Sequence, residues 1–280
     1  MKNFLILLIL FLFSTISADA AIKISPAYIE LDANKSNKDY ITGSFSVSGA
    51  KDETIRFKVY PVFFSHDTKG YFTEVEDSGQ KNSLMGKIKF YPQEFTCKDG
   101  LEQKVRFTIT DLKSLPNGDS RVLLFLEDVN TREISIKRAD GSVGGSITVK
   151  TRVGVPIYVD KGLYSKKGTL DAVAFKQKGE DFSCEYKVSS IGNSKIRYSG
   201  FAYLSQGKEL IQKFEIFGRQ IQAGNFLETA QKLDIPKDKL KLGEPYKVKF
   251  VLTYKDEKNR EKVLKKEFLF TPEKTASSQM

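Results

Sequence analysis

The sequence has no tryptophan, one histidine and two cysteines, and this shortage argues against most metal and nucleophile chemistry. A structural zinc ion needs four Cys or His ligands, whereas His66, Cys97 and Cys184 are the only candidates and are remote in sequence. A Ser-His-Asp or Cys-His arrangement would have to be built around His66, which we expect in an exposed loop. We therefore expect no metal, no cofactor and no enzymatic activity.

Phosphate-binding glycine loops are also missing. Residues 141–146, Gly-Ser-Val-Gly-Gly-Ser, are rich in glycine but lead into a strand and not into the start of a helix. This segment is interpreted as a flexible loop.

The two cysteines stand in segments with the alternation of a strand. Cys184 alternates with Phe182 and Tyr186, and Cys97 shares a face with Phe95. Because alternate side chains of a strand point to the same side, both thiols are expected in cores. We predict two buried free thiols, with an inter-domain disulfide as the alternative that an oxidising compartment permits.

Only one long apolar run occurs, and it stands at the start of the chain. Residues 4–13 are apolar and are followed by Ala18-Asp19-Ala20, which is typical of a secretory signal peptide cleaved after Ala20. The run is shorter than the roughly 17 to 25 residues of a membrane-spanning helix. The sequence therefore predicts a periplasmic or otherwise exported protein without a transmembrane segment.

The charge balance is strongly basic, with a formal net charge of +10 and a pI near 9.3. Such a balance favours an anionic envelope surface or an acidic partner protein. Nucleic acid is not an expected partner, because the chain is predicted to be exported.

Short runs rich in Val, Ile, Phe, Tyr and Thr, separated by Gly, Asn, Asp and Lys, fill the rest of the chain. The candidate strands are residues 22–31, 40–48, 54–64, 86–90, 103–110, 121–128 and 146–159, followed by 168–176, 181–190, 196–205, 209–216, 225–232, 245–254 and 260–270. Two sets of antiparallel strands indicate an all-β protein with two immunoglobulin-like β-sandwich domains in tandem.

The domain boundary is expected where glycine and lysine interrupt the apolar pattern after a long strand, near residues 160–167. We assign residues 1–20 to the signal peptide, 21–160 to the N-terminal domain and 161–271 to the C-terminal domain. Residues 272–280 lack apolar content and are expected to form a disordered tail.

A family resemblance emerges between residues 90 and 159. The motifs that carry it are Tyr91-Pro92, Gly100, Gln103-Lys104-Val105-Arg106, Leu115-Pro116, Asp119-Ser120-Arg121 and the long strand from Ile147 to Val159. In this order they resemble the first domain of the PapD-like periplasmic chaperones of pilus assembly. The first domain, residues 21–160, would then be a PapD-like domain.

The resemblance implies that the protein binds an exported subunit, pilin-like or adhesin, or another envelope protein. A chaperone of this family lends its last first-domain strand to an incomplete subunit sandwich by edge pairing. The matching client-binding residues here are Val143, Ile147, Val149 and Thr151. The alternative is that these residues are ordinary core residues of a sandwich strand.

The anchoring residues of the family are replaced. Family members hold the terminal carboxylate of the subunit with an Arg on the first strand and a Lys on the last strand. The sequence has Tyr28 at the first position and Gly154 at the second. Lys23, Lys150 or Arg152 could take over from nearby, or these cations could simply face solvent.

Arg106 matches a Val-Arg step of the family and is predicted to be structural, in a buried salt bridge or a strand-end hydrogen bond. The sequence thus predicts a periplasmic chaperone or accessory protein for the assembly of surface fibres or adhesins. The alternative is a structural or adhesive immunoglobulin-like envelope protein without chaperone activity.

Overall fold

The structure is a computed structural model that describes residues 22–77, 79–130, 132–137, 143–236 and 239–273. The predicted signal peptide lies outside these residues. Among the residues described, no helix is long and apolar enough to cross a membrane.

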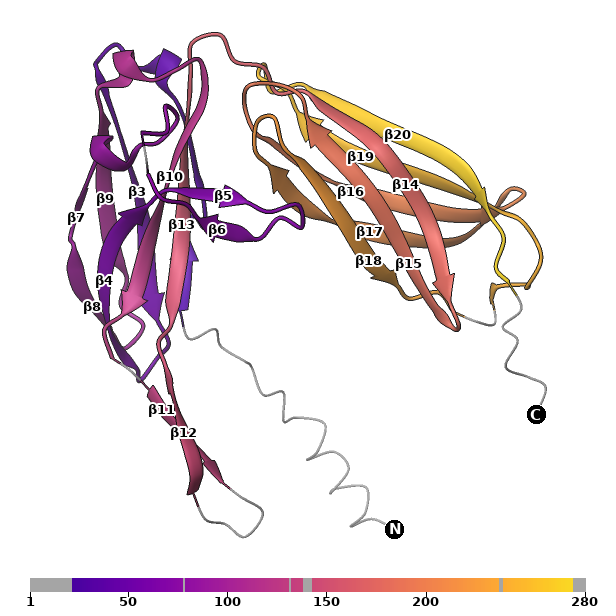
Figure 1. The fold of residues 1–280 in the computed structure, drawn as a ribbon, viewed down its shortest axis with the longest axis horizontal. Coiled ribbons are helices and arrows are strands. Elements are labelled where there is room, and N and C mark those ends of the chain that lie inside the picture. The colour runs from indigo at the N-terminus through magenta and orange to yellow at the C-terminus, as the bar shows by residue number, and fades with distance from the viewer. Residues whose placement is uncertain (1–21, 78, 131, 138–142, 237–238, 274–280) are drawn as a thin grey trace, which may run out of the picture.

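The first domain is a β-sandwich of two sheets (Figure 1). The strands of the first sheet, in spatial order, are β1 (Ile22–Ser25), β3 (Tyr40–Gly49), β9 (Gln103–Thr110) and β7 (Ile88–Tyr91). Those of the second are β2 (Ile29–Asp32), β13 (Arg152–Lys161), β10 (Gly118–Asp128), β4 (Thr54–Val62) and β8 (Glu94–Lys98). Alternate apolar side chains fill the space between the sheets, with Phe45, Phe57, Val105 and Ile157 nearly inaccessible to solvent.

The second domain is also a two-sheet sandwich. One sheet orders β14 (Gly168–Lys178), β15 (Asp181–Ser190) and β18 (Phe226–Leu233). The other orders β17 (Glu209–Ile221), β16 (Ile196–Gln206), β19 (Tyr246–Lys255) and β20 (Glu261–Phe270). Its core is separate from that of the first domain, so the prediction of two tandem β-sandwiches is confirmed.

Two hairpins and three short 3-10 helices complete the described fold. The hairpins pair β5 (Phe64–His66) with β6 (Phe72–Glu74) and β11 (Arg132–Lys137) with β12 (Val143–Val149). The 3-10 helices are η1 (Ala33–Lys35), η2 (Met85–Lys87) and η3 (Leu112–Ser114). Figure 1 shows β11–β12 projecting beyond the end of the first sandwich and β5–β6 directed toward the second domain.

Several first-domain strands differ from the predicted ranges. The expected strand 22–31 divides at the cis Ser25–Pro26 bond, and its halves join different sheets. The expected strand 146–159 divides at residues 150–151 into β12 and β13. Strands β5, β6, β8 and β11 are not among the predicted strands as separate elements, because they are short, with three to six residues each.

The predictions for the cysteines are confirmed, whereas that for the histidine is wrong. Cys97 and Cys184 are both free and buried. His66 ends strand β5, half-buried, with its ring against those of Phe64 and Phe72. Its two apolar neighbours come from a hairpin that the sequence did not reveal.

The end of the C-terminal domain extends into the predicted tail. Pro272 is buried, and its carbonyl accepts a hydrogen bond from the backbone amide of Gly243 at 2.8 Å. The Glu273 backbone amide donates a hydrogen bond to Gln177 Oε1 at 2.8 Å. Residues 274–280 lie outside the described part of the chain.

The tip of the β5–β6 hairpin contacts the second domain. The amide of Glu228 on β18 donates to the carbonyl of Thr68 at 2.7 Å, and Ser65 Oγ lies 3.1 Å from Gln222 Oε1. The hairpin is therefore a second connection between the domains, besides the chain itself at residues 162–167.

Candidate functional site

An unpaired backbone edge runs along β12 and the beginning of β13. Within the described residues, β12 pairs with β11 on one side only. Strand β13 pairs with β10 along its length, but with β2 only from Ile157 to Asp160. Among the described strands, none pairs with the edge from Val143 to Pro156.

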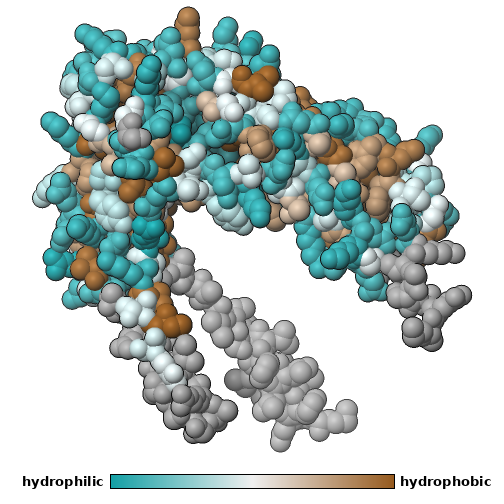
Figure 2. Space-filling view, viewed as in Figure 1, coloured by the Kyte–Doolittle hydropathy of each residue, from teal (hydrophilic) through white to brown (hydrophobic). Residues whose placement is uncertain are grey.

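The side chains of β12 face solvent. Ile147 is 52% exposed and Val149 is 37% exposed, and neither belongs to the core of the first sandwich. Thr151 is exposed at the junction with β13. For Val143 only the backbone is described, paired with Lys137. The alternative that Ile147 and Val149 are ordinary core residues is therefore wrong for this chain, and Figure 2 shows apolar side chains on the projecting hairpin.

Two of the predicted anchoring cations lie at the base of this hairpin, each beside a carboxylate. Lys150 pairs with Glu127, and Arg152 pairs with Glu74 of β6 at 2.5 Å. The Arg152 guanidinium also lies 4.5 Å from the ring centre of Phe125. Their interactions tie the start of β13 to β10 and to the β5–β6 hairpin.

Hydrogen bonding lowers the pKa of the Glu127 carboxyl at the base of the hairpin. The Tyr60 hydroxyl donates to Glu127 at 2.8 Å. Hydrogen bonds from Lys150 and Tyr60 hold the pKa of the Glu127 carboxyl below its usual range. The Glu127 carboxylate is therefore charged at neutral pH and forms an ion pair with Lys150.

Packing against β10 explains why position 154 is a glycine. It lies opposite Phe125 on β10, and a Cβ atom there would come within 2.8 Å of Leu123 Cδ1. A lysine at this position, as in the family that the sequence resembles, would require Leu123 to move. Another candidate, Lys23, lies away from this hairpin and is exposed on β1, opposite Ser48.

Arg106 is exposed on β9, opposite Ser44 in β3. The expected buried salt bridge is therefore wrong, because the side chain of this strand position points outward. A structural role for Arg106 stays a prediction.

Tyr28 lies in a cleft between the two domains. It precedes β2, whose first residue Ile29 is paired with Ile157, so Tyr28 stands near the end of the open β13 edge. The cleft encloses about 410 Å³ and is also lined by Glu30 and Arg197. The Arg197 guanidinium lies 3.7 Å from the centre of the Tyr28 ring. The second domain thereby places an arginine beside Tyr28.

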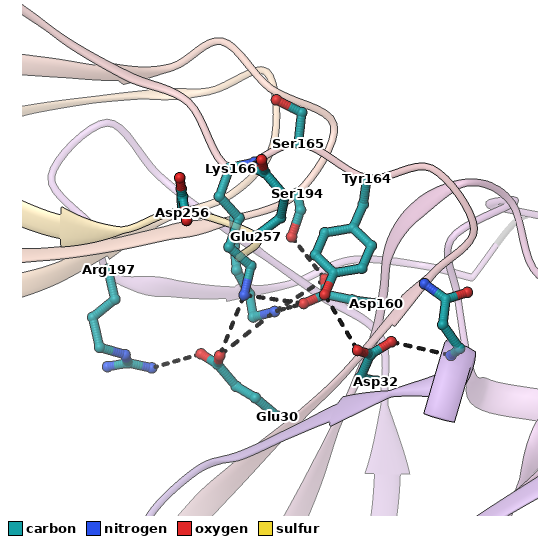
Figure 3. A network of polar contacts seen from close by, with 12 residues as sticks. Glu30, Asp32, Asp160, Tyr164, Ser165, Lys166, Ser194, Arg197, Asp256 and Glu257 are labelled. Carbon is teal, nitrogen blue, oxygen red and sulfur yellow. Dashed lines mark hydrogen bonds and ion pairs between the residues drawn. The ribbon is translucent and has the colours of Figure 1, made fainter. Parts of the chain in front are cut away.

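Asp160 at the end of β13 is the centre of a buried polar network (Figure 3). It accepts a hydrogen bond from Ser194 Oγ at 2.7 Å, and its carboxylate lies 3.3 Å from Lys195 Nζ and 3.1 Å from Lys166 Nζ. Lys195 is only 1% exposed. All three partners lie in or just before the second domain, so the network joins the two sandwiches.

Glu30 adds a second carboxylate to this network. It lies 3.8 Å from Arg197 and 4.0 Å from Lys195, both on β16 or directly before it. In Figure 3, Arg197 approaches Glu30 from one side, and Lys166, which contacts both acids, lies between Glu30 and Asp160. The two first-domain acids thus balance a group of second-domain cations.

A further buried carboxyl belongs to Asp119. Burial raises its pKa, although Lys195 and Arg121 act in the opposite direction. Arg121, 3.9 Å from Asp119, donates from Nε to the carbonyl of Phe64 at 2.9 Å. It thereby connects this carboxyl to the base of the β5–β6 hairpin.

Sequence reasoning missed the cations Lys166, Lys195 and Arg197. Lys195 and Arg197 stand far along the chain from the predicted strand, and Lys166 lies in the linker between the two sets of predicted strands. Only the packing of one domain on the other brings them to β13.

Comparison with family models finds no match, and comparison with curated proteins also finds none. Solved structures with a similar fold include the class 5 fimbriae chaperone CfaA, at 12% identity and a TM-score of 0.40, covering 90% of this chain and 99% of that one. Another is the CsuC–CsuE chaperone–tip adhesion subunit complex of Acinetobacter baumannii, at 13% identity and a TM-score of 0.45, covering 88% and 98%.

A third is the Salmonella enterica SafA pilin in complex with the SafB chaperone, at 11% identity and a TM-score of 0.38, covering 89% of this chain and 95% of that one. Fimbrial chaperones are therefore among the proteins to which this chain is similar.

Proposed function

We propose that the protein is an exported chaperone for subunits of surface fibres or adhesins, and that it binds a subunit by lending the open edge of β12 and β13. The observation that carries the proposal is the combination of an unpaired edge with outward apolar side chains, Ile147 and Val149, on a hairpin outside the sandwich. The periplasmic location and the cleavage after Ala20 are part of the proposal.

Edge pairing suits this geometry physically. Each backbone hydrogen bond to a client strand contributes about 0.5 to 1.5 kcal/mol net, and alternate side chains give specificity. Val143, Ile147 and Val149 would enter successive pockets of the client, with Thr151 last on the same face. No nucleotide is needed, because an incomplete sheet is stabilised by pairing alone.

We propose two different roles for the cations near this edge. Lys150 and Arg152 hold the base of the hairpin through Glu127 and Glu74, so a client carboxylate would have to compete with these acids. Arg197 lies in the cleft beside Tyr28, where it is 39% exposed and its own acidic partner, Glu30, is 3.8 Å away. Because this is the longest ion-pair distance of the three, Arg197 is the best placed to receive a terminal carboxylate. Lys23 would act only as a peripheral charge.

The test is an affinity purification of the tagged mature protein from its native envelope fraction. A double variant, Ile147→Asp with Val149→Asp, places carboxylates on the proposed client face, where burying an unpaired charge costs several kcal/mol. The matched control, Ser146→Asp with Thr148→Asp, adds the same charge to the other face of the same strand. Recovered proteins are identified by mass spectrometry.

We expect wild type and control to recover the same exported β-rich subunit, and the client-face variant to lose it. Hydrogen exchange of the purified complex should then show protection of the amides between residues 143 and 156. If a folded Ile147→Asp/Val149→Asp variant recovers as much of the subunit as wild type does, the proposal is contradicted. A structural or adhesive envelope protein would then be the better description.

A further inference from the structure

The outer face of the β17-β16-β19-β20 sheet carries an apolar band with one residue from each strand. Phe217 on β17 is 60% exposed, Phe201 on β16 is 38% exposed and Val263 on β20 is 58% exposed. Val251 on β19 lies directly opposite Phe201. An antiparallel sheet with one face in water normally places polar residues on that face, so this band departs from the expected alternation.

The β1-β3-β9-β7 sheet of the first domain has a polar centre on its outer face. The outward residues of β3 from Thr42 to Ser48 are all Thr or Ser, and those of β9 include Lys104 and Arg106. Exposed rings, Tyr40 and Tyr91, lie only at strand ends of that sheet. The apolar band in the middle of the second-domain sheet has no counterpart there.

Charged residues flank the band in a regular order. Across the strands, one row reads Glu215, Phe201, Val251 and Lys265. The next row reads Lys213, Tyr203, Lys249 and Glu267. In each row the residues on the two edge strands, β17 and β20, have opposite charges. The order of the signs is reversed between the two rows.

We propose that this face binds a second copy of the same chain, with a two-fold axis parallel to the strands between β16 and β19. This rotation places β17 of one copy over β20 of the other. Glu215 then faces Lys265 of the second copy, and Lys213 faces Glu267. Phe217 meets Val263, and Phe201 meets Val251. The surface is self-complementary, as an isologous interface requires.

Sheets that pack face to face lie about 10 Å apart with their strands within about 30° of parallel. Long side chains such as Lys and Glu can pair across this distance at the edges of the interface, while Phe and Val fill its centre. Four strands spaced about 4.8 Å apart make a small interface, so the dimer is a weak one. The proposed client edge of β12 lies in the other domain and is not covered by it.

The test uses two charge variants of the mature protein. Glu215→Lys with Glu267→Lys makes the four facing positions positive, and Lys213→Glu with Lys265→Glu makes them negative. Sedimentation velocity measures self-association. Near 0.15 M salt the Debye length is about 8 Å, so the salt screens distant charges and the measured association reflects charge pairs in direct contact. We expect wild type to dimerise and each variant alone to associate at least tenfold more weakly.

An equimolar mixture of the two variants should restore association, because every facing pair is again of opposite charge. The control for non-specific attraction adds Lys176→Glu and Lys178→Glu on β14 to the positive variant, so that its proposed face stays positive. Mixed with the positive variant, this protein should not associate. Circular dichroism verifies that each variant is folded. A monomeric wild type, or variants that associate as wild type does, would overturn the proposal.

The open edge of β12 is the other place where two copies could meet. Ile147→Asp with Val149→Asp separates the two modes. If this variant abolishes self-association while the charge variants keep it, the contact is through the hairpin and the proposed face is wrong. If it leaves the dimer intact, the result supports the proposal.

Discussion

At the scale of single residues, the most consequential side chain is Lys195, a cation that is almost fully buried at the domain junction. It lies 3.3 Å from Asp160, which is also buried. Replacing a buried ion pair by apolar residues is often tolerated, whereas removing one partner leaves a charge without compensation. Lys195 is therefore a residue whose loss affects both domains.

We expect Lys195→Ala to lower the free energy of unfolding by about 3 kcal/mol. The control is Lys232→Ala, which removes the exposed pair between Lys232 and Asp181 and should cost less than about 1 kcal/mol. Urea titration of both variants measures the difference. Equal losses in the two variants would show that the buried pair contributes no more than a surface one.

His66 predicts a pH dependence of stability. Burial and the nearby Arg121 lower its pKa in the folded protein to about 4, from 6.5. Between these values the unfolded chain binds more protons than the folded one, so stability is full above pH 6.5 and falls as the pH drops toward 4. His66→Gln should flatten this part of the curve.

The measurement is the free energy of unfolding of wild type and His66→Gln at several pH values between 7 and 4. Because the ring is only partly buried, we expect the histidine to account for about 1 kcal/mol of the loss. Parallel curves for the two proteins would mean that His66 is as readily protonated in the folded state as in the unfolded state.

At the scale of elements, the free edge strands of the sheets differ in their charge. Strand β20 is an edge strand with Lys262, Lys265 and Lys266 along it, and charged side chains are a known means of preventing edge-to-edge association. Strand β12 has an edge of the same kind, but its residues 143–149 carry no charge. The difference fits an edge that is kept available for pairing.

We expect Lys262→Val with Lys266→Val to increase aggregation, since it removes the charges that guard β20. Light scattering during incubation at 37 °C measures the rate. Arg56→Val with Lys58→Val on strand β4 of the first domain is the control, because that strand already has partners on both sides. If the control aggregates as fast, hydrophobicity and not the edge is responsible.

At the scale of the whole molecule, two separate contacts set the arrangement of the domains. One is the network around Asp160, and the other is the tip of the β5–β6 hairpin against β18. The linker between the sandwiches is short, and Asn193 adds hydrogen bonds to it: its Oδ1 accepts from the Ser165 amide at 2.7 Å. The domains are thereby held at one angle.

Replacing residues 66–72 by a two-residue Asn-Gly turn should loosen this arrangement without unfolding either sandwich, because the hairpin lies outside both main sheets. We expect the radius of gyration from small-angle X-ray scattering to rise and the amide of Glu228 to exchange faster. An unchanged scattering profile would mean that the network around Asp160 suffices to fix the angle.

The sequence by itself determined the fold class, because strand alternation and turn residues depend only on neighbours along the chain. It placed all seven strands of the second domain and both buried cysteines, since each is marked by its own alternation. It also singled out Ile147 and Val149, although it could not tell an exposed strand from a core strand. Both have the same alternating pattern.

Only the tertiary structure decided which of these strands has a free edge and which cations surround it. The pairing of β2 with β13 stops at Ile157, and Arg197 reaches Tyr28 from the other domain. Neither fact follows from local sequence, because strand partners and domain contacts join residues that are far apart along the chain. Alternation along a strand indicates its faces but not its neighbours, and in this protein the neighbours define the proposed site.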